Sequence, residues 1–252
     1  MRAIILAADF GTRLYPLTQG IPKAFLELGG KTLIDHLMGK LEPFPMIEEV
    51  TVITNGRFWL DVAKWRKDSH YKKPIHVIDN HVFHPEKRLG AVMDLELAIR
   101  ARRNERPQDD FLVLCGDNYF DFPLSHFLLR CLAHPRSGFA GLYDVKDPQD
   151  ATKFGVAALD SHERIIDFEE KPSQPKSTLV SIGVYYFPSA TQLRLYEYLE
   201  LERRNPDKIG DFLAWLVHKE PLYGVEFDGT WFDIGDVHSY EEARRQLDVT
   251  RV

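Results

Sequence analysis

Cysteine is scarce in this chain of 252 residues, and long apolar stretches and an excess of positive charge are missing. The two cysteines, Cys115 and Cys131, are too few for a disulfide framework or a thiolate metal site. No apolar run approaches the length of about 20 residues that a membrane helix needs. The formal net charge of −6 argues against a general affinity for nucleic acid or for anionic membranes.

The composition is that of an ordinary soluble globular protein, with 44% hydrophobic and 28% charged residues. The length allows one large α/β domain or two small ones, with a substantial core. Arg2 and the apolar residues 3–8 faintly resemble a signal peptide, but the run is too short and leads into a turn. We therefore expect a cytoplasmic enzyme with no nucleic-acid or membrane partner.

The first two dozen residues carry the clearest functional signal. Residues 3–8 are apolar without alternation, as expected of a strand buried on both faces of a parallel sheet. The strand breaks into the turn Asp9-Phe10-Gly11-Thr12-Arg13, which contains a glycine, a hydroxyl and a fixed cation. Such a turn presents backbone N–H groups and a guanidinium to a ligand at the sheet edge, and phosphate fits these donors. Lys23 could bring a second cation to the same place.

The rest of the first half alternates between strand and helix patterns. Helical spacing at 31–41, 58–67 and 92–102 separates strand-like runs at 49–55, 75–78 and 110–115. This alternation predicts a Rossmann-like α/β fold, with a mostly parallel (mixed) sheet covered on both faces and ligands at the carboxyl ends of its strands. Further strands are predicted at 139–145, 153–157, 165–170 and 181–187. Helices are predicted at 191–204, where Leu193 is expected in the core, and at 212–217, the last capped by Asp211.

A carboxylate follows the apolar strand 110–115 directly. Asp117, beside the small Gly116, is well placed there to hold Mg²⁺. An aspartate at a strand end is also a common turn former or helix cap, so this residue alone leaves both interpretations open. Near the C-terminus, Asp233 and Asp236 lie in the segment Asp228–Asp236, and Asp236 could equally cap a following helix.

These segments together resemble the sugar-1-phosphate nucleotidyltransferases, also called NDP-sugar pyrophosphorylases, and are similar to the glucose-1-phosphate thymidylyltransferases. The N-terminal stretch looks like that family's signature L-A-A-G-x-G-T-R-L-x-P-L-T followed by P-K. The resemblance continues through F-G-V, E-K-P, I-G-V-Y and W-x-D-x-G segments and covers residues 2–236. It implies a single nucleotidyltransferase domain over 1–252, with residues 1–130 mainly binding nucleotide and 131–252 mainly binding the sugar phosphate.

The resemblance also implies the reaction and the residues that carry it. The phosphate of a sugar 1-phosphate attacks the α-phosphorus of an NTP, pyrophosphate leaves, and Mg²⁺ neutralises the developing charge. Arg13, Lys23 and Asp117 would be catalytic, and Asp117 and Asp233 would bind the metal. The implied nucleotide-binding residues are Leu6, Ala8, Gly11, Thr12 and Gly90, and the implied sugar-phosphate residues are Gly155, Glu170, Lys171 and Gly183.

Two of these assignments have ordinary alternatives. Gly90 could simply ease a loop into the helix that follows it. Glu170 and Lys171 are neighbours at a predicted strand, where successive side chains point to opposite faces, so one of them could be a solvated surface charge.

The sequence departs from the family pattern at the motif's first glycine, which is Asp9 here, and at Ala24, where proline is commoner. An aspartate adds a negative charge near the expected triphosphate site. At an effective dielectric near 20, two unit charges about 5 Å apart repel by roughly 3 kcal/mol. The cost vanishes if the carboxylate turns away or joins the metal shell; otherwise we expect weakened NTP binding. The thymidylyltransferases have a glutamine a few residues before the glycine that corresponds to Gly90, and this chain has none there. The choice of nucleobase is therefore left open.

Three other functions compete with catalysis on sugar phosphates. Asp9 and Ala24 favour a binding or regulatory subunit that does not turn substrate over. A cytidylyltransferase acting on phosphocholine would share the chemistry and the fold. A dinucleotide-dependent oxidoreductase is disfavoured because no G-x-G-x-x-G follows the first strand. The sequence is compatible with a homo-oligomer and does not fix the assembly.

Overall fold

The computed structural model describes residues 1–101, 108–201 and 207–249, and these form two compact units. The first unit combines Met1–Arg88 with Leu114–Asp121 and the C-terminal segment from Thr230. The second unit contains the described residues of Leu89–Val113 and Phe122–Gly229. The functional division at residue 130 stays a prediction.

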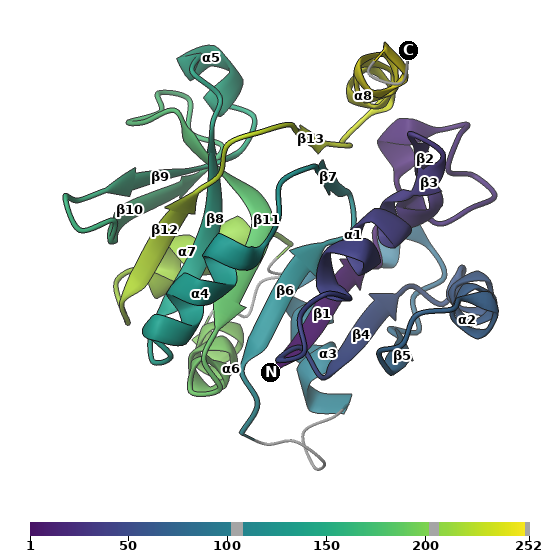
Figure 1. The fold of residues 1–252 in the computed structure, drawn as a ribbon, viewed down its shortest axis with the longest axis horizontal. Coiled ribbons are helices and arrows are strands. Elements are labelled where there is room, and N and C mark those ends of the chain that lie inside the picture. Colours follow the sequence, from purple (N-terminus) through teal and green to yellow (C-terminus); the bar gives the residue numbers. More distant parts are fainter. Residues whose placement is uncertain (102–107, 202–206, 250–252) are drawn as a thin grey trace. The chain divides into compact units, whose positions relative to one another are not determined.

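Parallel strands form the centre of the first unit (Figure 1). Strand β1 pairs with β4 from Arg2 opposite Glu49 to Ala7 opposite Thr54, and β4 pairs in parallel with β5. All residues of β4 are buried, as expected of a parallel strand that is covered on both faces. The carboxyl ends of the three strands therefore lie at one edge. The strands are β1 (Arg2–Ala7), β4 (Glu49–Thr54) and β5 (Ile75–Asp79).

The first helix of this unit begins later than its pattern predicts. The Thr32 hydroxyl accepts a hydrogen bond from the Asp35 amide at 3.2 Å, so Thr32 is the N-cap of α1 (Leu33–Leu41). Lys31–Thr32 instead forms β3, which pairs with β2 (Glu27–Leu28). The predicted apolar face of α1 is buried and packs in the core. The other helices of the unit are α2 (Trp59–Asp68) and α8 (Val237–Val249).

Two short strands from distant parts of the sequence meet in the first unit. β7 (Asn118–Phe120) pairs antiparallel with β13 (Trp231–Asp233), and the two lie side by side in Figure 1. A buried hydrophobic cluster packs around this strand pair. Its residues come from the N-terminal loop, the β2–β3 hairpin, β7 and the start of α8. Its buried members are Leu14, Leu26, Leu28, Leu33, Tyr119, Ile234, Tyr240 and Ala243.

Antiparallel pairing dominates the second unit. β8 (Gly138–Asp144) and β9 (Gly155–Leu159) each pair antiparallel with β11 (Leu179–Phe187), and β10 (Ile165–Glu170) pairs antiparallel with β9. β12 (Leu222–Glu226) runs parallel to β8. β6 (Phe111–Cys115) is divided, with its last two residues in the first unit. The predicted mixed α/β sheet is confirmed, and parallel pairing dominates only in the first unit.

The helices of the second unit correct two expectations. Asp211 does not cap its helix, because α7 (Ile209–Leu216) begins two residues earlier, with Lys208 as N-cap. Leu193, expected in the core, is 69% exposed, and Leu195 and Tyr198 are buried instead. Residue 102 and residues 202–204 of two predicted helices lie outside the described residues. The helices are α3 (Ala91–Ala101), α4 (Ser125–Ala133), α5 (Pro148–Ala151), α6 (Thr191–Leu201) and α7.

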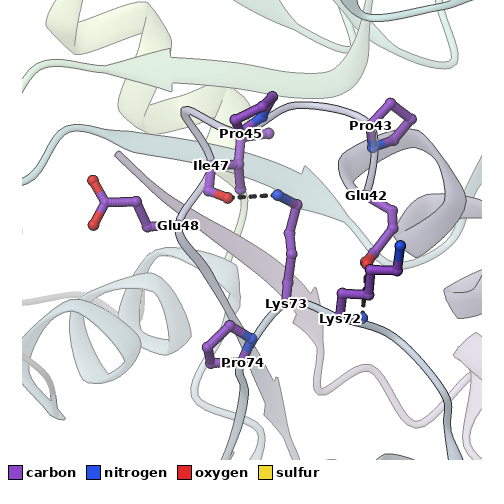
Figure 2. A pocket seen from close by; sticks show the side chains of 8 residues that line it. All are labelled: Glu42, Pro43, Pro45, Ile47, Glu48, Lys72, Lys73 and Pro74. Atoms are coloured by element: carbon purple, nitrogen blue, oxygen red, sulfur yellow. Dashed lines mark hydrogen bonds between the residues drawn. The ribbon is translucent and has the colours of Figure 1, made fainter.

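A shallow hollow lies at the opposite edge of the parallel strands, before β4 and β5 begin (Figure 2). Three prolines and an isoleucine give it an apolar wall. The Lys73 ammonium crosses it and donates to the carbonyl oxygens of Phe44 and Ile47 at 2.8 and 2.7 Å. These hydrogen bonds join the loop before β5 to the loop before β4. The hollow therefore lies away from the predicted site residues, which follow the carboxyl ends of the strands. No helix in the described residues is long and apolar enough to cross a membrane.

Candidate active site

The turn after β1 is shaped by Gly11. Its φ of +62° places it in the left-handed region, and its carbonyl accepts a 2.7 Å hydrogen bond from the buried Thr18 hydroxyl. A Cβ on Gly11 would lie 3.1 Å from that side chain, so a larger residue would be both strained and crowded. Asn55, buried after β4, donates to the carbonyl of Ala8 at 3.1 Å and fixes the start of the turn. The carboxyl edge of the sheet therefore carries a firmly held loop.

Asp9 does not turn away from this loop. Its Oδ1 accepts a hydrogen bond from the Gly11 amide at 3.1 Å, and its Oδ2 accepts one from the Lys23 ammonium at 2.9 Å. The same ammonium donates to Asp117 Oδ2 at 2.7 Å. Lys23 is only 3% exposed, whereas the side chains of Asp9 and Asp117 are 55% and 27% exposed. The buried cation thus lies between two carboxylates that face solvent in part.

The electrostatics of this trio follow from that arrangement. Burial acts to lower the pKa of Lys23, but the charges of Asp117, Asp9 and Asp233 outweigh it and raise the pKa above 10.5. Burial likewise acts to raise the pKa of Asp9, but Lys23 and the Gly11 amide hold it below 3.8. Lys23 and Asp9 are therefore both charged at neutral pH. Lys23 is a fixed cation at the sheet edge.

Asp117 and Asp233 are brought together by the pairing of β7 with β13. Asp233 lies opposite Asn118, and the Ile234 amide donates to the Asp117 carbonyl at 2.9 Å. The Asn118 side chain donates to Asp117 Oδ1 at 2.9 Å and accepts from the Trp231 indole at 2.8 Å. The carboxylate of Asp117 is consequently held by hydrogen bonds on both oxygens.

Gly235 leaves room for two charged side chains. A Cβ at this position would lie 3.3 Å from Asp233 Oδ2 and 3.7 Å from Arg13 Nη2, so the carboxylate and the guanidinium both reach over it. Asp236 has a different role. Its Oδ1 accepts a hydrogen bond from the Ser239 amide at 2.9 Å, so the side chain caps the N-terminus of α8. The alternative interpretation of Asp236 is therefore the correct one.

The two carboxylates suit a hard divalent cation, which prefers oxygen ligands. Mg²⁺ commonly takes one or two protein carboxylates and completes its shell with water and substrate phosphates. Asp117 and Asp233 offer such a partial set. Within the described residues, no group of three or more His, Cys, Asp or Glu could hold a metal by itself. The two carboxylates therefore suit Mg²⁺ when water or substrate phosphates supply its remaining ligands.

The predicted nucleotide-binding residues of the N-terminal segment lie around this loop. Leu6 and Ala8 flank the end of β1, and Thr12 begins the single 3₁₀ turn Thr12–Leu14 with its side chain exposed. Gly90 belongs to the second unit, where it precedes α3 with a φ of +89°. This left-handed backbone by itself explains why a glycine stands there, in agreement with the alternative that Gly90 eases the loop into the helix. A role of Gly90 in binding the base stays a prediction.

The second group of predicted residues lies at the β9–β10 pair. Gly155 is opposite Glu170, whose side chain is 12% exposed and turned inward. Lys171 follows the end of β10 in a left-handed conformation, with a φ of +53°, and its side chain is exposed. The two neighbours thus have opposite environments, as the alternation predicts. Gly183 forms a left-handed irregularity within β11, where the register with β8 shifts.

Glu170 has a cation partner that the sequence does not single out. Lys208, the N-cap of α7, places its ammonium 3.5 Å from Glu170 Oε1. Burial raises the pKa of Glu170, and Lys208 and Lys171 oppose this effect. Gly210 gives the carboxylate its space, because a Cβ there would lie 2.0 Å from Glu170 Oε2. Nothing in the local sequence signals Lys208 or Gly210, whereas Asn118 and Trp231 belong to segments that do resemble the family.

Comparison with known proteins gives a consistent result over the whole chain. A family model described as Nucleotidyl transferase matches residues 2–249. The chain is 29% identical over 250 residues to the bifunctional protein GlmU of Methanocaldococcus jannaschii, covering 98% of this chain and 54% of that protein. It is 27% identical over 248 residues to the UTP–glucose-1-phosphate uridylyltransferase AglF of Haloferax volcanii, covering 98% and 96%. The chain thus spans about half the length of its GlmU relative and nearly all of AglF.

Solved structures agree with these relatives. A structure from Bacillus anthracis, described as a glucose-1-phosphate thymidylyltransferase in complex with sucrose, matches with a TM-score of 0.84 at 26% identity. The match covers 98% of this chain and 95% of that chain. A UDP-glucose pyrophosphorylase complexed with UDP-glucose matches with a TM-score of 0.82 at 21% identity, over 99% of both chains, and supports the fold alone.

Proposed function

This chain belongs to the nucleotidyl transferase family, and we propose that it transfers a nucleotidyl group from an NTP to a sugar 1-phosphate and releases pyrophosphate. The observation that carries the proposal is the fixed cation Lys23, held beside Asp117 at the edge of the sheet where Arg13 and Asp233 also lie. This is a site for polyanions with a place for a divalent cation. AglF and the thymidylyltransferase structure, whose names describe this reaction class, support the same function.

For this reaction the protein has mainly to position the two substrates and to oppose their negative charge. A phosphomonoester is already an anion at neutral pH, so the attack on the α-phosphorus needs no general base. Arg13 would bind the triphosphate with its forked donors. Lys23 would hold the α-phosphate and oppose the negative charge that grows there in the transition state. Its burial favours this role, because an ammonium that is shielded from water acts more strongly on a nearby phosphate.

Mg²⁺ is proposed as the cofactor, with Asp117 and Asp233 as its protein ligands. When bound, it would supply positive charge to the phosphate oxygens of the reactants. The contribution of the chain is to fix the two carboxylates. Asn118 and Lys23 hold Asp117 through hydrogen bonds, and the pairing of β13 with β7 fixes the backbone of Asp233.

The second unit is proposed to bind the sugar phosphate. The exposed Lys171 would bind the phosphate, and Glu170 would accept hydrogen bonds from sugar hydroxyls. Gly155 and Gly183 would let the sugar approach the backbone.

A second candidate function is a nucleotidyltransferase-like binding or regulatory subunit. The contact of Asp9 with the Gly11 amide and with Lys23 favours it, since these donors would otherwise be free to bind phosphate. Intact Arg13, Lys23, Asp117 and Asp233 favour catalysis. The two functions differ in whether pyrophosphate is formed.

The test is pyrophosphate release with Mg²⁺, measured for each NTP against a panel of sugar 1-phosphates and phosphocholine. Asp117→Asn keeps the size of the side chain and removes its charge, and we expect it to lower turnover by at least about 100-fold. Asp68→Asn makes the same charge change at the exposed end of α2 and should leave turnover unaltered. Pyrophosphate formed only with phosphocholine would reassign the acceptor. No release with any pair, together with binding of a nucleotide sugar, would favour the regulatory subunit.

A further inference from the structure

The carboxylate of Asp9 makes the contacts that a bound phosphate would make. Phosphate groups bind to backbone N–H groups of turns after strands and to lysine ammonium groups. In this chain the Gly11 amide donates to Asp9 Oδ1 and the Lys23 ammonium donates to Asp9 Oδ2. Both oxygens of the carboxylate are therefore engaged by donors of the predicted triphosphate site.

We propose that Asp9 is a resident competitor for the triphosphate, an anion built into the chain that a nucleotide must displace in order to bind. The inference rests on the proposed function, because it concerns the same loop. It goes beyond that function by assigning Asp9 a role in setting nucleotide affinity.

The neighbouring geometry explains why the competition is local. Gly11 is held in its left-handed conformation by the Thr18 hydroxyl, so the direction of its N–H group is fixed whether or not Asp9 is bonded to it. Lys23 retains Asp117 as a second partner at 2.7 Å when Asp9 moves away. The loop and the lysine thus have their own supports. Asp9 is 55% exposed and can swing toward water without breaking the core.

The size of the effect follows from charge. Removing a unit negative charge about 5 Å from a phosphate changes affinity by at most about 100-fold at an effective dielectric near 20. Water at the half-exposed Asp9 screens this interaction, so the expected change in affinity is about tenfold in total. We expect the affinity for phosphate to increase stepwise from wild type to Asp9→Asn to Asp9→Gly. Asp9→Asn keeps one acceptor oxygen and so releases one of the two donors, and Asp9→Gly releases both.

The experiment measures binding of inorganic tripolyphosphate by isothermal titration calorimetry, which removes the unknown base from the problem. Affinity should rise from wild type to Asp9→Asn to Asp9→Gly, by about tenfold in total. Asp68→Asn, with the same charge change on exposed α2, should bind as wild type does. In steady state, Asp9→Asn should lower the KM for the NTP without lowering kcat, a split that general loosening of the loop would not give.

The outcomes separate this inference from the proposed function. Equal or weaker binding in both Asp9 variants overturns the competitor role and leaves the proposed function intact. No binding of tripolyphosphate or NTP by any form overturns both, since the loop is then no phosphate site. If Asp9→Gly fails to fold, as judged by circular dichroism, the isosteric Asp9→Asn decides the matter on its own.

Discussion

Replacing Lys23 by methionine removes a buried positive charge from between Asp9 and Asp117 and keeps most of the length of the side chain. In the wild-type protein the ammonium lies 2.9 Å from one carboxylate and 2.7 Å from the other. The variant leaves the two carboxylates facing each other without the cation. We therefore expect Lys23→Met to fold with reduced stability at neutral pH.

The magnitude follows from burial. Removing one partner of a fully buried ion pair typically costs 3–5 kcal/mol. Here the two carboxylates are 55% and 27% exposed, so water solvates them in part, and a loss of about 2 kcal/mol in the free energy of unfolding is expected. Lys64→Met, on the exposed side of α2, is the matched control and should change stability by less than about 0.5 kcal/mol.

The pH dependence gives a sharper test. The pKa of Asp9 is lowered below 3.8 in the folded wild type, so its contribution to stability is present above that pH and is lost as the pH falls through the lowered pKa. The pKa of Lys23 is raised above 10.5, so its contribution is present in full below that pH and is lost as the pH rises through the raised pKa. The difference in stability between wild type and Lys23→Met should therefore be constant from about pH 5 to 9. It should shrink below about pH 4.

Urea unfolding without divalent cations, followed by circular dichroism at several pH values, measures this difference. Equal stability of the two proteins at pH 7 would refute the ion-pair account. A difference that grows on acidification would refute the sign of the Asp9 shift.

Three glycines provide further predictions. Gly116→Ala would place a Cβ 2.7 Å from the Leu6 carbonyl oxygen, and because a backbone atom cannot yield easily, we expect a loss of about 2 kcal/mol by thermal unfolding. Gly39→Ala, with open space around it in α1, should instead be neutral or stabilising by up to about 1 kcal/mol, and equal effects at the two sites would contradict the reasoning. Gly210→Ala should displace the Glu170 carboxylate and raise the KM for the sugar 1-phosphate about tenfold, with the KM for the NTP unchanged. A rise in both constants would show a general disturbance of the second unit.

The N-terminal part of the site could be predicted from the sequence because its signals are local. A buried strand that ends in a glycine turn places its ligand-binding groups within a few residues, and Lys23 follows closely. The meeting of Asp117 and Asp233 could not be derived in the same way. It depends on β7 and β13, which have three residues each and are too short for a hydrophobic period. Only the resemblance to the family suggested it.

The second unit shows the other limit of sequence reasoning. Strand and helix alternate in the first hundred residues, which led to the prediction of a mainly parallel sheet. β9, β10 and β11 follow one another through loops without helices and so pair antiparallel. The partner of Glu170 was missed for a similar reason. Lys208 lies far from it in the sequence, and Gly210 is small because a side chain from another element occupies its space.

The most direct test of the central claim is the stoichiometry of the reaction. With Mg²⁺, an accepted NTP and an accepted sugar 1-phosphate, pyrophosphate and nucleotide sugar are measured together, the first by an enzyme-coupled assay and the second by mass spectrometry. Nucleotidyl transfer predicts one nucleotide sugar for each pyrophosphate, and neither product when the sugar phosphate is left out. Pyrophosphate formed without a nucleotide sugar, with the nucleoside monophosphate in its place, would contradict it.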